Sequence, residues 1–226
     1  MWTFVGKLQV HLVPLFLVFV LLHAVFLAPG NLWGMQIPNL EAQASVRFGA
    51  QAVQTVLRWE SMIGTNANAD VQKKLAAVND FFNQNIAYQW ETEDYWSTPL
   101  ETMGRGIGDC EDYAIAKYAT LTLMGVPPSS LRLVYVKAKR GGLNQAHMVL
   151  AWYETPNAVP LIIDNLDYVI RPATERGDLQ PVFSFNGEQL WVGTGPRPTN
   201  QQPTARLSRW GQVVEKIRLE GFTTGF

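Results

Sequence analysis

The chain has 226 residues, of which 47% are hydrophobic and 16% are charged, and its formal net charge is −1. This length and apolar content suit one globular domain with a substantial core, and they argue against a disordered chain. The near-neutral charge argues against nucleic acid binding, which requires a strongly basic face. We therefore predict a globular protein with no nucleic acid partner.

The N-terminus has the layout of an export signal. Lys7 precedes an apolar run over residues 12–28, and Pro29 and Gly30 follow it. That order is typical of a secretory signal peptide, with competing cleavage sites at residues 28–30 and 42–44. The run, about seventeen residues long, also suits an uncleaved membrane anchor, and a buried helix of the fold is a third reading. We assign residues 1–30 to a signal peptide or anchor and expect export.

Hydrophobic spacing predicts three helices, over residues 41–62, 71–85 and 110–124. Asp70 is a candidate cap for the second helix, and Gly125 ends the third.

A long connection over residues 88–108 separates the second helix from the third and is rich in aromatic residues and glycine. Loops of that length in compact domains are often binding loops. Its aromatic residues, Trp90, Tyr95 and Trp96, either line a substrate groove or bury the loop itself.

In the second half of the chain the pattern predicts mainly strands. They are predicted over residues 131–138, 146–152 and 159–164, with weaker ones near 181–185 and 189–192. After a polar connector, residues 206–219 suit a last amphipathic helix, on which we expect Trp210 to pack rather than to anchor a partner. The fold class is α+β, with helices packed on an antiparallel sheet. We assign residues 40–195 to the main domain and 196–226 to a C-terminal connector and helix.

Cys110 is the only cysteine of the chain, and His147 is the only histidine after the apolar N-terminal run. Cys110 begins a predicted helix, where exposed amide groups and the helix dipole favour a thiolate. A lone cysteine in a helix is more often a packing residue, so a catalytic role for Cys110 must be argued from the residues around it.

Asp164 is the candidate partner of His147. If residues 146–152 and 159–164 form a hairpin around residues 153–158, His147 lies opposite Asp164, with Cβ atoms about 4.5–5.5 Å apart. A carboxylate there would orient the imidazole and select its tautomer. The order Cys110, His147, Asp164 suits a thiol protease or acyltransferase. We predict that these residues act, in that order, as nucleophile, general base and orienting acid. The alternative is an ordinary strand-end histidine beside a turn aspartate, and a one-residue slip would separate the pair.

Three carboxylates surround the candidate nucleophile: Asp109, Glu111 and Asp112. Their charges would raise the pKa of the thiol and oppose the thiolate. A bound Ca²⁺ resolves that conflict, because carboxylate oxygens are its preferred ligands. We therefore predict a calcium site at Asp109, Glu111 and Asp112. The alternative is that acidic residues simply favour the first turn of a helix.

Several motifs, in order, are similar to those of the bacterial transglutaminase-like cysteine proteinases: Tyr95-Trp96-x-Thr98-Pro99-x-Glu101, Gly108-Asp109-Cys110-Glu111-Asp112-Tyr113-Ala114-Ile115-Ala116-Lys117, Ala146-His147-Met148-Val149-Leu150 and Leu161-Ile162-Ile163-Asp164-Asn165. The resemblance covers roughly residues 40–195. It implies a transglutaminase/papain-like core with the cysteine at a helix N-terminus. His147 lies 37 positions after Cys110, which is too close for a papain-type enzyme itself, where the histidine lies about 130–150 positions downstream.

The resemblance also implies a biological role. Such enzymes are calcium-dependent periplasmic endopeptidases that cut a large surface adhesin near its N-terminus, at a di-alanine site. The cut releases the adhesin and disperses the biofilm, and an inner-membrane cyclic-di-GMP receptor restrains the protease by sequestering it. By motif match Cys110, His147 and Asp164 form the triad, and Asp109, Glu111 and Asp112 belong to the calcium site.

Two other functions stay open at this point. An acyltransferase of the same fold would use the same triad and pass the acyl group to an amine. A non-enzymatic binding module of this fold is the third hypothesis, against which the intact Cys110, His147 and Asp164 argue. The oxyanion donors are undetermined, with the amide of Cys110 and the Tyr95–Trp96 segment as candidates.

Overall fold

The computed structural model describes residues 1, 37, 39–90, 93–223 and 225–226. Apart from Met1, the predicted export signal at residues 1–30 lies outside the described residues. Within the described part, no helix has both the length and the apolar character that crossing a membrane requires. From Ile37 onward, the described residues belong to one compact unit.

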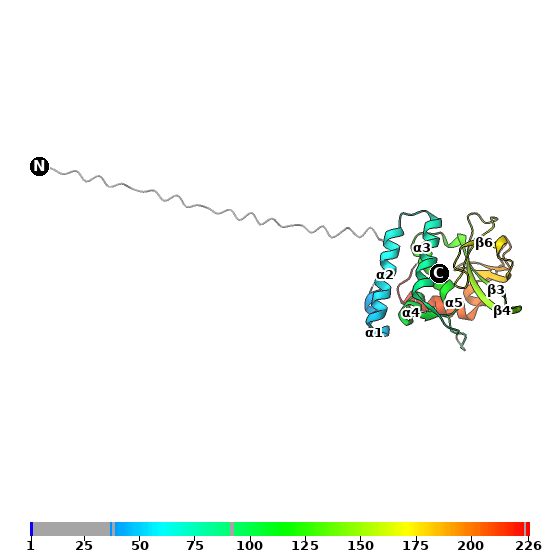
Figure 1. Cartoon of the computed structure of the whole chain (residues 1–226), viewed down its shortest axis with the longest axis horizontal. Coiled ribbons are helices and arrows are strands. Elements are labelled where there is room, and N and C mark those ends of the chain that lie inside the picture. Colours follow the sequence, from blue (N-terminus) through cyan, green and yellow to red (C-terminus); the bar gives the residue numbers. More distant parts are fainter. Residues whose placement is uncertain (2–36, 38, 91–92, 224) are drawn as a thin grey trace. The chain divides into compact units, whose positions relative to one another are not determined.

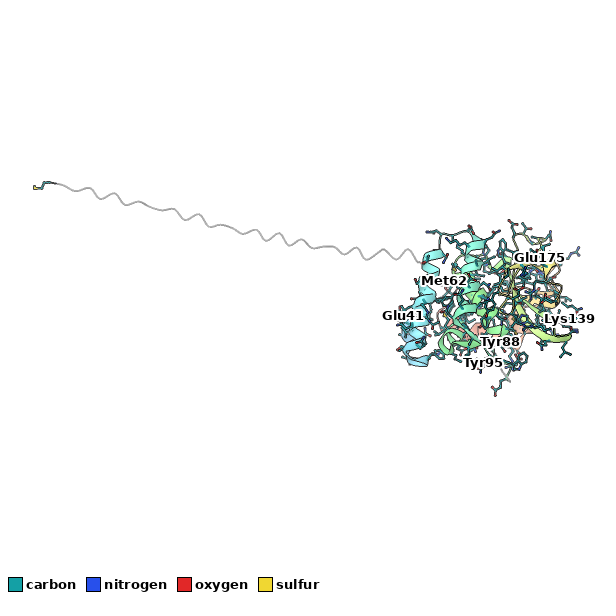
Figure 2. All side chains as sticks on the ribbon, viewed as in Figure 1. Glu41, Met62, Tyr88, Tyr95, Lys139 and Glu175 are labelled. Carbon is teal, nitrogen blue, oxygen red and sulfur yellow. The ribbon has the colours of Figure 1, made fainter. Side chains whose placement is uncertain are left out.

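The described residues form helices on one side of a sheet (Figure 1). The helices are α1 (Leu40–Phe48), α2 (Ala50–Asn66), α3 (Val71–Asn85), α4 (Pro99–Arg105), α5 (Cys110–Leu123), α6 (Pro203–Arg206) and α7 (Ser208–Leu219). The strands are β1 (Ala87–Tyr88), β2 (Ile107–Gly108), β3 (Leu131–Arg140), β4 (Leu143–Trp152), β5 (Leu161–Ile163), β6 (Arg171–Pro172), β7 (Leu179–Phe185) and β8 (Leu190–Val192). In Figure 2, Glu41 and Met62 mark the helical side and Lys139 marks the sheet side.

The main sheet has six antiparallel strands in the order β6-β5-β4-β3-β7-β8. Alternate residues of its strands face the helices and belong to the main core, as Leu133 and Leu150 do. The residues between them, such as Val134 and Val149, form a second apolar cluster. The α+β class and the antiparallel sheet predicted from the sequence are confirmed.

Helix α5 lies at the centre of this arrangement. All of its residues except Glu111 are buried, because it packs against α3, α4, β3 and β4. It ends where expected: Gly125 takes a left-handed conformation with φ 80°, and Pro127 and Pro128 follow. A helix buried on all sides is a rigid base for the residues at its N-terminus.

One helix prediction needs correction. The helix expected over residues 41–62 is divided into α1 and α2 by Gly49, whose φ of 85° is accessible mainly to glycine. The helix expected over 206–219 is confirmed as α7, which begins at Ser208, and the short α6 that precedes it was not predicted. At Gly49 the hydrophobic spacing continues across the break, so periodicity alone could not locate it.

The connection over residues 88–108 also contains a helix, α4, that we did not predict. Thr98 and Glu101 form a capping box, and Pro99 occupies the first turn. That combination was present in the sequence and could have identified the helix.

The C-terminal helix α7 packs into the main core. Trp210 is fully buried and contacts the rings of Tyr118, Phe185 and Phe226. The expectation that Trp210 packs rather than anchors a partner is confirmed.

Candidate active site

Cys110 occupies the first position of α5 and is 4% exposed. The start of this helix is held by Asp112, whose Oδ1 accepts from the Ser97 amide at 2.7 Å and whose Oδ2 accepts from the Asp109 amide at 3.3 Å. Gly108 makes this close arrangement possible, since a Cβ at that position would lie 2.9 Å from Cβ of Asp112. The carboxylate of Asp112 therefore ties the aromatic connection to the helix that carries the thiol.

The surroundings of the thiol favour its protonated form. Sγ of Cys110 donates to Oε2 of Glu111 at 2.8 Å. Burial, the charge and hydrogen bond of Glu111 and the charge of Asp109 raise the pKa of Cys110, and a hydrogen bond from the Met148 backbone opposes them. The expected effect of the helix N-terminus, a lower thiol pKa, is thus outweighed by burial and by the carboxylates.

His147 and Asp164 form a buried pair. Nε2 of His147 lies 2.8 Å from Oδ1 of Asp164, and the two residues are 3% and 1% exposed. Because a carboxylate only accepts, Nε2 carries the hydrogen and Nδ1 is the other ring nitrogen. The backbone of Met148, the residue after His147, acts on the sulfur of Cys110, so the thiol lies near the strand that carries the imidazole.

The strand register behind this pair differs from the prediction. Leu150 pairs with Ile163 and Trp152 with Leu161, so His147 is not directly opposite Asp164. The connection is longer than expected, because Val159 and Pro160 stay outside the ladder and Pro160 has no amide hydrogen to donate. The shift is two residues, and an even shift leaves both side chains on the same face of the sheet.

Arg176 is a partner of Asp164 that the sequence did not reveal. Its Nη2 donates to Oδ2 of Asp164 and to Oδ2 of Asp178, both at 2.9 Å. Burial raises the pKa of Asp164, but the hydrogen bond and charge of His147, the Leu166 amide and Arg176 lower it to about 2. The acid is therefore ionised across the physiological range and fixed by partners at both oxygens.

The three carboxylates predicted to hold a cation are not equivalent. Donor atoms of Asp109, Cys110 and Glu111 lie within 4.8 Å of one another. Asp112 is not in that group, and its two oxygens accept backbone amides from Ser97 and Asp109. The structure thus brings the carboxylates of Asp109 and Glu111 together and directs that of Asp112 toward backbone amides.

Cys110 opens into a groove of about 500 Å³. One wall is aromatic, with the rings of Tyr135 and Phe183 stacked at 5.1 Å. Trp90 also lines the groove and is 63% exposed, which favours the groove over burial of the loop for this residue. The C-terminal segment contributes Arg206, Leu207, Ser208 and Arg209.

The Tyr95–Trp96 segment beside this groove is tied to the C-terminal helix. The hydroxyl of Tyr95 donates to Oε1 of Glu101 at 2.7 Å. Nζ of Lys216 donates to the Trp96 carbonyl at 3.0 Å and to Oε2 of Glu101 at 3.2 Å. Helix α7 thereby determines the position of the connection that borders the thiol.

A second pocket, of about 410 Å³, is lined by His147, Asp164 and Arg176. Glu175, which also lines it, and Tyr95 lie toward opposite ends of the domain in Figure 2.

The model of the bacterial transglutaminase-like cysteine proteinases matches residues 46–178 of this chain. The chain belongs to this family. No relative is found among the curated proteins.

Solved structures of a family member, LapG of Legionella pneumophila, are similar to this cysteine proteinase. The EGTA-treated form is 35% identical, with a TM-score of 0.72, and the match covers 81% of this chain and 98% of that one. The calcium-bound form is also 35% identical with a TM-score of 0.72, and 81% and 99% of the two chains are covered.

Proposed function

We propose that this protein is a calcium-dependent cysteine endopeptidase in which Cys110, His147 and Asp164 act together. The observation that carries the proposal is the buried imidazole–carboxylate pair, whose imidazole lies on the strand near Cys110, with the thiol of Cys110 opening into a groove. An acid that orients an imidazole next to a cysteine is the arrangement that thiol-dependent acyl transfer requires.

In this proposal each residue has a defined role. Nδ1 of His147 takes the thiol proton, and Sγ of Cys110 attacks the carbonyl carbon of the scissile peptide bond. The imidazolium, held by Asp164, then gives its proton to the departing amine, which leaves a thioester. Water, deprotonated by His147, hydrolyses the thioester and frees the thiol. The sulfur must first leave the Glu111 carboxylate, to which it now donates.

Asp109 and Glu111 are the residues we propose to hold calcium. Their carboxylate oxygens are hard donors of the kind that Ca²⁺ prefers, and with Sγ of Cys110 their donor atoms converge within 4.8 Å. Asp112 would support them by fixing the helix start. When bound, the cation would neutralise charge that otherwise raises the pKa of the thiol. That Legionella LapG has been solved calcium-bound supports this proposal.

The biological role we propose follows from the family resemblance. The enzyme would act in the periplasm and cut the N-terminal region of a large surface adhesin, which releases the adhesin and promotes biofilm dispersal. An inner-membrane cyclic-di-GMP receptor would sequester the enzyme. The groove beside Cys110, open enough to receive an extended segment, is compatible with a polypeptide substrate.

The test uses the purified full chain and an adhesin N-terminal fragment with its di-alanine site. Wild-type protein with calcium should cut the fragment once, and Cys110→Ala should abolish cutting without altering the circular dichroism spectrum. Asp70→Ala, which removes a cap from α3 away from the site, is the control that keeps activity. Cutting by the Cys110→Ala variant would contradict the nucleophile assignment.

The same reaction distinguishes hydrolysis from acyl transfer. With a primary amine added, a hydrolase gives product with a free carboxylate, whereas an acyltransferase gives product joined to the amine. Mass spectrometry of the new C-terminus reports the difference directly.

A further inference from the structure

Lys117 is a buried lysine that the proposed chemistry does not use. It is 1% exposed and lies on α5, the helix that begins with Cys110. Lys117 lies seven positions after Cys110, about two helical turns, so both side chains leave nearly the same face of the helix. Glu111 and Asp112 lie in the first turn and the residues from Tyr113 to Ala116 are uncharged, so Lys117 is the only charged residue of α5 beyond its first turn.

The ammonium group of Lys117 has three acceptors for its three hydrogens. Nζ lies 2.8 Å from Oδ1 of Asn79, 2.8 Å from Oδ1 of Asn83 and 3.1 Å from the backbone carbonyl of Asp164. Burial lowers the pKa of Lys117 to about 7, and the charges of Asp164 and Asp80 oppose that shift. A buried ammonium is tolerated because all of its donors are satisfied.

The two asparagines extend this contact to the whole loop that carries the acid. Nδ2 of Asn83 donates to the Asp164 carbonyl at 3.0 Å, and Nδ2 of Asn79 donates to the Tyr168 carbonyl at 2.8 Å. Residues 164–168 are thus attached at both ends to α3 and, through Lys117, to α5. Asp164 lies just beyond the end of β5, so the sheet ladder does not hold its backbone.

We infer that Lys117, with Asn79 and Asn83, is a positioning residue that sets the place of Asp164 relative to Cys110. The inference rests on the proposed function of the triad. Lys117 does not touch the reacting atoms; it links the helix that carries the nucleophile to the backbone of the acid. If the link is lost, the acid loop moves relative to α5 and the imidazole loses its fixed orientation.

Lys117→Met separates positioning from stability. Methionine fills similar volume without charge but leaves three buried acceptors without the ammonium, so some loss of stability is expected and kcat is measured where the variant is folded. We expect kcat on the adhesin fragment to fall by about 10- to 100-fold, because small displacements of catalytic groups have effects of that size. KM should change by less than about twofold, since the groove is untouched. Asn83→Ala, which keeps the ammonium, should lose about fivefold in kcat.

Lys74→Met is the matched control. Lys74 also donates to a backbone carbonyl of the α5 segment, that of Met124 at 2.7 Å, but at the end of the helix remote from Cys110. Its loss should leave kcat within about twofold of wild type, because no catalytic group depends on that bond.

A spectroscopic readout tests the geometry without any substrate. The Nε2 hydrogen of His147 is bonded to Asp164, so its NMR signal should lie downfield and exchange slowly with water. The signal is identified by its loss in His147→Gln. It should persist in Lys74→Met and be broadened or lost in Lys117→Met at a temperature where both proteins are folded.

The inference is overturned if folded Lys117→Met retains wild-type kcat and an unchanged imidazole signal. It is equally overturned if activity falls only in proportion to the unfolded fraction while the signal of the folded protein stays sharp. If the wild type cuts no substrate but the signal responds as expected, the positioning role stands and the proposed function fails.

Discussion

Replacing Arg176 by methionine should destabilise the protein far more than the same change at Arg171. Both arginines lie close together in the chain and form ion pairs, but their surroundings differ. The side chains of Arg176 and Asp164 are 6% and 0% exposed, whereas those of Arg171 and Asp167 are 40% and 33% exposed. The pair of variants therefore compares a buried with an exposed interaction in one loop region.

The size of the effect follows from what each change leaves behind. Without Arg176, the ionised carboxylate of Asp164 stays buried with one of its oxygens lacking its cationic partner, and breaking such a pair costs about 3–5 kcal/mol. Asp178 adds little, because its side chain is 42% exposed and regains water. We therefore expect the free energy of unfolding to fall by about 3 kcal/mol, and the thermal midpoint by about 6–12 °C. Arg171→Met should cost about 0–1 kcal/mol.

Urea and thermal unfolding of both variants measure these differences. Arg176→Lys should recover part of the loss, since it keeps the charge but loses the fork that reaches Asp164 and Asp178 together. The acid-unfolding midpoint of Arg176→Met should also move to higher pH, because removing the guanidinium raises the pKa of Asp164. Equal, small effects of Arg176→Met and Arg171→Met would refute the view that Asp164 depends on a buried cation.

Three further outcomes are expected. Burial raises the pKa of Asp164, but its hydrogen bonds and the neighbouring imidazole lower it to about 2. The lowered pKa contributes about 2 kcal/mol to the free energy of unfolding, a contribution that is complete above pH ~4 and is lost as pH falls toward ~2. Asp164→Asn should therefore flatten that part of a stability–pH curve. Gly108→Ala should lower both melting temperature and activity, because its Cβ would lie 3.0 Å from Oδ2 of Asp112; Gly177→Ala, which meets nothing within 4 Å, is the control. Chelation with EGTA should abolish fragment cutting, calcium should restore it better than magnesium, and Glu111→Gln should raise the calcium concentration needed; activity indifferent to EGTA would contradict the metal assignment.

Local chemistry was sufficient to predict most elements of this fold. Helix α5 was recognisable from its apolar residues and the Gly125–Pro127 ending, and β3, β4, β7 and β8 from apolar runs between turns. The candidate triad was also accessible from the sequence, because one thiol and one imidazole after the N-terminal run leave few combinations. Each of these signals depends on residues near one another in the chain.

What the sequence could not decide depends on contacts between distant segments. The break at Gly49 and the register of β4 and β5 are set by packing and by a proline outside the ladder, which periodicity does not record. The partners of Asp164 come from residues 117 and 176, which no linear pattern joins to it. A lone lysine in an apolar helix was a visible signal, but its partners were not.

The sequence by itself thus determined most of the helices and strands and the residue types available for chemistry, because propensity and hydrophobic spacing act over a few residues. Only the tertiary structure decided which carboxylate faces the thiol, which one supports the helix start, and what holds the acid in place. Those outcomes depend on burial and on hydrogen bonds formed after the chain has folded, when desolvation makes each unsatisfied polar group costly.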